Sequence, residues 1–126
     1  MRIFDTLKKA QLIDYLYTSH IHDSKIESIQ NDREKSSVTI QFYNQVFNDR
    51  LTIVFKNVKK QYKIKGCYQN NEKTVNSLTV EDDYSSIRSH TGLSKEDIDD
   101  SLYLILQFFS GDEFHIVSKE VIIITG

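Results

Sequence analysis

The stretch "SVTIQFYNQVFNDRLTIVF", Ser37–Phe55, decides the fold of this chain. In each half, apolar residues alternate with polar or small ones, at Val38, Ile40 and Phe42 and then at Leu51, Ile53 and Phe55. A period of two is typical of a strand that buries one face. Between the halves, "NQVFND" has the length and the residues of a hairpin loop. The stretch therefore predicts two antiparallel strands.

Further strand patterns lie C-terminal to this hairpin. They are "QYKIKGCYQ" from Gln61, with Tyr62, Ile64, Gly66 and Tyr68 expected inward and Lys63, Lys65 and Cys67 outward, "TVNSLTVED" from Thr74, "SLYLILQFF" from Ser101 and "FHIVSKEVIIIT" from Phe114. "SLYLILQFF" is apolar on both faces, which predicts a central strand. In "GLSKEDID", from Gly92, the Ser94 to Asp97 spacing is close to that of a capping box and predicts a short helical turn. No spacing of strand, helix and strand suggests a parallel sheet. We expect about seven strands in a mostly antiparallel sheet or sandwich.

The N-terminal segment has a helical pattern instead. A helical spacing connects Phe4, Leu7 and Gln11 and then Leu12, Ile13 and Leu16, and the pattern ends near Tyr17 to Ser19. We therefore predict one domain over residues 1–126 of the α+β class. It comprises an N-terminal helix over 1–19, packed on an antiparallel β region over 20–126.

Composition limits the compartment. The single cysteine, Cys67, cannot form a disulfide within the chain, so nothing favours an oxidising environment. No apolar run approaches the length of a membrane span, and the N-terminus lacks the apolar core of a secretion signal. We expect a cytoplasmic protein without a membrane partner.

The segment "HIHDSKIESI", His20–Ile29, poses the question of catalysis. His20 and His22 would share one side of a strand and could grip a metal, with Asp23, His90 or His115 as a further ligand. A two-residue histidine spacing alone is a weak signal. We instead expect Asp23 and Ser24 to bond backbone N–H groups where helix turns into strand. No metal site, cofactor or catalytic residue is predicted, and a metal-dependent enzyme using His20 and His22 is the alternative.

Charge is divided unevenly along the chain. The segment Arg50–Lys65 contains six bases and no acid, but the formal net charge of −2 and the sequence pI near 6.1 argue against a nucleic-acid partner. Residues 81–126 hold ten acids and three bases. A folded sheet can bring the two halves together and cancel the asymmetry.

The acidic part supplies the candidate partner-binding surface. Clustered carboxylates favour a basic protein partner, and Tyr and Arg often anchor interfaces. The candidate residues are Glu81, Asp82, Asp83, Tyr84, Arg88, Glu96, Asp97, Asp99 and Asp100.

The order of motifs also resembles known families. "HDSKIESI", followed by "SVTIQF", "LTIVFKNV" and "YLILQFFSGDEFHIVSKEVII", resembles small bacterial families of unknown function that begin with His-Asp-Ser and are similar to immunity proteins of polymorphic toxin systems. The resemblance implies a β-rich cytoplasmic protein that binds and blocks a cognate toxin and has no catalytic residue. A third interpretation is that the chain is a structural or regulatory subunit that forms a homodimer through a sheet edge. The sequence leaves the partner and the oligomeric state open.

Overall fold

The alternating stretches pair into one antiparallel sheet. The computed structural model describes residues 1–66 and 74–125. The elements are β1 (Arg2–Phe4), a 3-10 turn η1 (Thr6–Lys8), α1 (Lys9–Thr18), β2 (Lys25–Asp32), β3 (Ser37–Asn44), β4 (Asp49–Ile64), β5 (Val75–Glu81), α2 (Tyr84–Thr91), α3 (Lys95–Asp99), β6 (Leu102–Phe108) and β7 (Glu113–Thr125).

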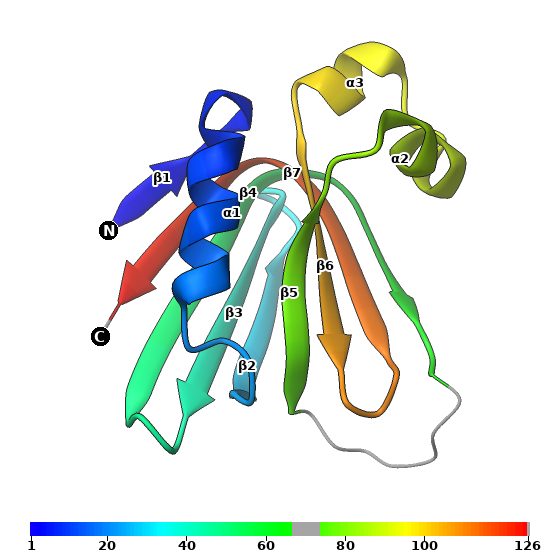
Figure 1. Cartoon of the computed structure of the whole chain (residues 1–126). Helices are drawn as coiled ribbons and strands as arrows, with labels where there is room; N and C mark the ends of the chain where they lie inside the picture. Colours follow the sequence, from blue (N-terminus) through cyan, green and yellow to red (C-terminus); the bar gives the residue numbers. More distant parts are fainter. Residues whose placement is uncertain (67–73, 126) are drawn as a thin grey trace.

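The sheet order is β2-β3-β4-β7-β6-β5, and β1 pairs with β7 outside this path (Figure 1). The two longest strands, β4 and β7, pair from Leu51 opposite Thr125 to Ile64 opposite Glu113. One end of this long ladder carries β3 and β1, and the other end carries β6. The predicted α+β class with about seven antiparallel strands and an N-terminal helix is confirmed.

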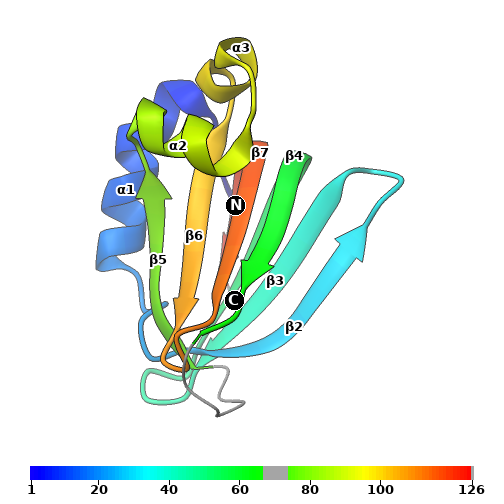
Figure 2. The ribbon, with the colours of Figure 1, turned by 90° about the vertical axis from the view of Figure 1, so that its right-hand side faces the viewer.

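The long ladder bends near its middle. Asn57 has a left-handed φ of 54°, and the register shifts between Val58 and Lys60. Such irregularities bend a strand and increase its twist. The sheet consequently curves, as the view in Figure 2 shows, and α1 lies beside β5 on the curved sheet.

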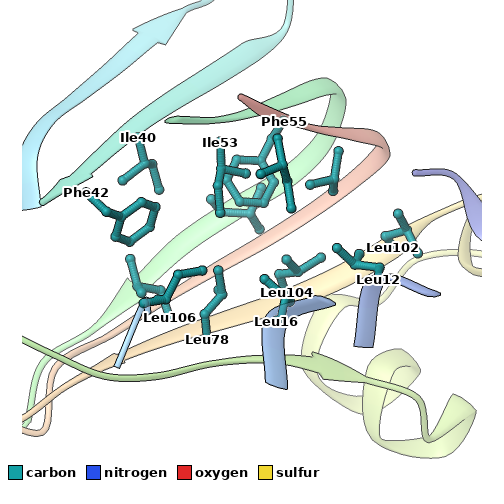
Figure 3. Packing of buried hydrophobic residues seen from close by; sticks show 14 of the residues in the cluster. Leu12, Leu16, Ile40, Phe42, Ile53, Phe55, Leu78, Leu102, Leu104 and Leu106 are labelled. Atoms are coloured by element: carbon teal, nitrogen blue, oxygen red, sulfur yellow. The ribbon is translucent and has the colours of Figure 1, made fainter. Parts of the chain in front are cut away.

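The core fills the space between the curved sheet and α1 (Figure 3). Leu12 and Leu16 are the buried residues of α1. They face the apolar residues of the strands, which the figure labels as Ile40, Phe42, Ile53, Phe55, Leu78, Leu102, Leu104 and Leu106. Burial of each such side chain stabilises the fold by roughly 1.5–3 kcal/mol. Within the described ranges, no helix is both long and apolar enough to cross a membrane.

The predicted start of the N-terminal helix is wrong. Arg2–Phe4 form strand β1, because Phe4 pairs with Val121 of β7 and is buried in the core. Asp5 then caps the 3-10 turn by accepting a hydrogen bond from the N–H of Leu7 at 3.0 Å. Leu7 and Ile13 are exposed, so they do not belong to the buried stripe.

The predicted facing of the second half of β4 is also wrong. Tyr62 lies opposite His115 and away from the main core, because Phe114 and Ile116 fill the core from β7. Ile64 is 43% exposed. Lys63, expected to point outward, lies opposite Phe114 with its Nζ 5.5 Å from the ring centroid. The expected positions of Cys67 and Tyr68 fall outside the described residues.

Candidate partner-binding surfaces

Two short helices follow β5 and carry most of the acidic candidates. The α2 helix begins after Asp83, whose carboxylate accepts a hydrogen bond from the N–H of Ser85 at 2.9 Å, and it ends at Gly92 with a φ of 68°. The α3 helix begins after Ser94, whose hydroxyl oxygen accepts from the N–H of Asp97 at 3.2 Å. The Ser94 to Asp97 spacing therefore predicted α3 correctly, whereas no sequence pattern predicted α2.

A second hydrophobic cluster fixes these helices to the sheet. Ile87 of α2 and Ile98 of α3 pack with Tyr103 and Val117. Tyr103 and Val117 lie on the face of β6 and β7 that is opposite to the main core. The neighbouring residues of both strands face the main core. Figure 1 shows both helices at one end of the molecule, and their buried contacts fix them there together with the acidic residues that they carry.

Several of the acidic candidates form ion pairs with lysines that are distant in sequence. Lys59 comes from the basic half of the chain, and Lys9 comes from α1. The Nζ-to-carboxylate distances are 2.9 Å for Lys9–Asp82, 3.4 Å for Lys59–Asp97, 3.7 Å for Lys59–Asp100 and 3.5 Å for Lys119–Asp100. These ion pairs neutralise part of the acidic charge. This agrees with the expectation that the folded sheet brings the basic and the acidic parts of the chain together.

The remaining carboxylates leave a negative surplus at this end. Glu81 accepts hydrogen bonds from the N–H groups of Asp82 and Asp83, at 3.1 and 3.0 Å. Glu96 and Asp99 are exposed and form no ion pair within the described part of the chain. These charges are available to a partner.

Tyr84 and Arg88 are one helical turn apart on α2. The Nη1 of Arg88 lies 3.5 Å from the phenol oxygen of Tyr84, and Tyr84 is 37% exposed. This pair adds an aromatic surface beside the carboxylates. All nine candidate residues lie between the end of β5 and the residue after α3, with Asp82 and Asp83 in the link between β5 and α2.

The basic segment does not present a free aromatic face. Phe55 is fully buried, so its ring is closed to a nucleic-acid base. The Nζ of Lys60 donates to the carbonyl of Thr91 at 2.6 Å, and Lys59 is paired with α3. The lysines nearest to α2 and α3 thus have partners within the molecule.

His20 and His22 lie in separate environments. The Nδ1 of His20 is 2.8 Å from the carboxylate of Asp49, and its ring stacks on Phe47. His22 instead lies beside the carboxylate of Asp23 at 3.0 Å. In residues 1–66 and 74–125, no group of three or more His, Cys, Asp or Glu side chains could hold a metal ion.

The His-Asp-Ser segment forms a tight turn, although its bonds differ from those expected. Asp23 has a left-handed φ of 68°. The hydroxyl of Ser24 donates to the carbonyl of His20 at 2.5 Å, whereas we expected it to accept from a backbone N–H. The buried side chain of Asn44 donates to the carbonyls of His20 and His22, at 3.0 and 3.3 Å. The segment is thus a turn held by side-chain hydrogen bonds.

A buried polar chain, which the sequence reading missed, connects β4, β6 and β7. The phenol oxygens of Tyr62 and Tyr103 are 2.6 Å apart, and Tyr103 lies 2.6 Å from Nδ1 of His115. The Nε2 of His115 lies 2.8 Å from the carboxylate of Glu113. Burial, and next the hydrogen bond with Tyr62, raise the pKa of Tyr103 above its ordinary value. The phenol of Tyr103 therefore stays neutral, which suits a structural role.

Two hollows border α1. One, of about 210 Å³, includes His20, Asp49 and Arg50 in its lining. The other, of about 380 Å³, lies between α1 and β5 and is lined by Ile13, Leu16 and Tyr17 on the helix side. Sequence patterns did not predict the second hollow, because it depends on where α1 docks.

Comparison with known proteins gives no further assignment: no protein-family model matches this chain, and a search of curated proteins found no match.

Proposed function

We propose that this chain is a non-catalytic protein-binding module that neutralises a bacterial toxin by direct binding, as immunity proteins do. The observation that carries the proposal is the set of carboxylates held at one end by α2 and α3, next to the exposed ring of Tyr84. Complementary charge speeds association with a basic partner and disfavours other partners.

The anchoring of the two helices supports this role. Their separate hydrophobic cluster, which contains Ile87 and Ile98, fixes the acidic surface before a partner arrives. A surface that is already ordered loses little conformational entropy on binding. The separation of His20 from His22 favours this function over the metal-dependent alternative, because the two rings do not converge.

Co-expression with the toxin encoded beside this gene tests the proposal. We expect the chain to restore growth and to form a complex with that toxin. The paired variant Glu96→Lys with Asp99→Lys should slow association at low salt by about tenfold or more, because it reverses charges that have no partner within the described part of the protein.

A matched control is Glu34→Lys, because Glu34 is also exposed but lies in the turn between β2 and β3. The control should associate with the toxin at the rate of the unmodified protein. Failure to protect against any neighbouring toxin, or equal slowing by both charge reversals, would argue against the proposed surface.

A further inference from the structure

The hollow between α1 and β5 runs along a strand edge. Five consecutive residues of β5, Asn76–Val80, line one wall, and Ile13, Leu16 and Tyr17 of α1 line the other. Figures 1 and 2 show the helix beside this strand. At about 3.3 Å per residue, five strand residues span roughly 16 Å. The groove therefore has the length of a short extended segment.

Within the described residues, the edge of β5 in this groove is paired only at its beginning. The N–H of Val75 donates to the carbonyl of Ser24 at 2.8 Å, and the N–H of Asp23 donates to the carbonyl of Val75 at 2.9 Å. From Asn76 onward, β5 has strand pairing only with β6 in the described chain. The edge thus already exchanges backbone hydrogen bonds with the residues that precede β2, and within the described residues it then continues without a strand neighbour.

The two strands at the ends of the sheet order, β2 and β5, differ in how their edges are protected against pairing with another chain. The pairing of β2 contains an irregularity between Ile26 and Ser28, and β2 carries Lys25, Glu27 and Asp32. Charges and bulges are the usual means of preventing an edge from pairing with another chain. By contrast, Asn76–Val80 contains no charged residue. The β5 edge therefore lacks protection by charge where it borders the groove, although its pairing with β6 is irregular between Val75 and Ser77.

Charge changes sharply at one end of the groove. Val80 is followed by Glu81, Asp82 and Asp83, of which Asp82 is paired with Lys9. An occupant that follows β5 beyond Val80 meets this negative charge. Basic residues at that end of the occupant would be complementary to it.

We propose that the groove between α1 and β5 accepts a strand from the partner protein. The partner's extended segment is uncharged where it lies along Asn76–Val80 and basic where it passes Glu81–Asp83. It adds to the sheet by backbone hydrogen bonds, while its apolar side chains contact Ile13 and Tyr17. The inference rests on the proposed function, because the occupant belongs to the same partner.

A second copy of this chain is a poorer occupant than an isolated extended segment. The β5 edge of a copy is flanked by its own α1, with Ile13 and the 90% exposed Tyr17 beside it. If the β5 edges of two copies paired, the α1 helices of both copies would have to occupy the space beside the joined strands. An extended segment without a flanking helix avoids that crowding.

A peptide tests the groove without the toxin. The probe is a capped peptide of alternating valine and threonine that ends in two lysines, and its effects are followed by NMR. We expect slower amide exchange within Asn76–Val80 and shifted signals of Ile13 and Tyr17. N-methylation of one alternating set, either the valines or the threonines, should abolish binding, and N-methylation of the other set should preserve it, because only alternate residues of an edge strand point their N–H groups toward β5.

Variants of the protein give the matched comparison. Ile13→Lys places a charge in the groove, whereas Ile29→Lys places one on β2, outside the groove, and the two isoleucines are 40% and 38% exposed. Ile13→Lys should weaken peptide binding and toxin association by tenfold or more, and Ile29→Lys should leave both unchanged. Both variants should remain folded, as circular dichroism can verify.

Three outcomes would overturn the inference. They are peptide protection outside Asn76–Val80, equal binding of both N-methylated peptides, and dimerisation of the chain with protection of these same amides in the absence of peptide. Peptide binding without toxin protection would instead reject only the proposed function. If Ile13→Lys leaves protection against the toxin unchanged and no peptide binds, only the proposal for the groove would be rejected.

Discussion

The phenol oxygen of Tyr103 lies 2.6 Å from Nδ1 of His115, on the side of the sheet away from the main core. Both side chains are buried, and their rings meet edge to face with centroids 5.6 Å apart. This contact joins β6 to β7 beneath the second hydrophobic cluster. It explains how polar side chains are accommodated under the end of the molecule that carries α2 and α3.

Replacement Tyr103→Phe should lower the free energy of unfolding by about 1–3 kcal/mol. It removes the hydroxyl group and leaves buried polar atoms of His115 and Tyr62 with fewer partners. Urea denaturation measures the change. Tyr43→Phe is a suitable control, because Tyr43 donates to the exposed side chain of Asn48 at 3.1 Å. Equal losses in both variants would contradict a special contribution of the buried hydroxyl.

The same tyrosine predicts a loss of stability in alkali. The raised pKa of Tyr103 means that the folded protein keeps this proton at a pH where the unfolded chain releases it. The contribution of this proton to the free energy of unfolding is therefore fully present below about pH 10, the pKa of a tyrosine in the unfolded chain. Above that pH the contribution declines by up to about 1.4 kcal/mol per pH unit. Denaturation from pH 9 upward should show a shallower decline for Tyr103→Phe than for the unmodified protein. Parallel pH profiles would exclude this linkage.

Asn44→Ala should destabilise the protein by about 2 kcal/mol or more. The buried Asn44 side chain donates to the carbonyls of His20 and His22 and accepts from the N–H groups of Val46 and Phe47. Its loss leaves several backbone groups without partners. Thermal unfolding measures the effect, and Gln45→Ala is the exposed neighbouring control. A loss below 0.5 kcal/mol would show that this residue does not hold the turn.

Gly66→Ala should destabilise the end of β4. A Cβ added at Gly66 would lie 2.3 Å from the carbonyl carbon of Gly111, so backbone must move to admit it. Movement would also disturb the hydrogen bond from the Gly66 N–H to Asp112, which is 2.6 Å long. We expect a cost of about 1–3 kcal/mol, measured by urea denaturation. Wild-type stability in Gly66→Ala would mean that these two segments are not closely packed.

The metal-dependent alternative has a direct test. Protein purified without a histidine tag should contain no stoichiometric transition metal by elemental analysis. His22→Ala should change the free energy of unfolding by less than about 0.5 kcal/mol, because the His22 side chain is 61% exposed. One bound metal per chain, lost in both His20→Ala and His22→Ala, would reject the interpretation of this segment as a turn.

Part of the local structure could be predicted from residues that are close together in the sequence. Alternation at Val38–Phe42 and at Leu51–Phe55 was enough to predict the β3–β4 hairpin, and these residues do fill the core. The helical stripe predicted the burial of Leu12 and Leu16. Ser94 predicted the start of α3. Each of these features depends on neighbours within a few residues, so a local pattern reports it.

Features that depend on distant partners could not be predicted from the sequence. Pairing with Val121 makes Phe4 part of a strand, and pairing with His115 places Tyr62 away from the core. The Lys59–Asp97 ion pair and the groove beside Asn76–Val80 arise in the same way. Strand pairing and helix docking join residues far apart in sequence, so the alternation of a single strand cannot specify which side meets which partner.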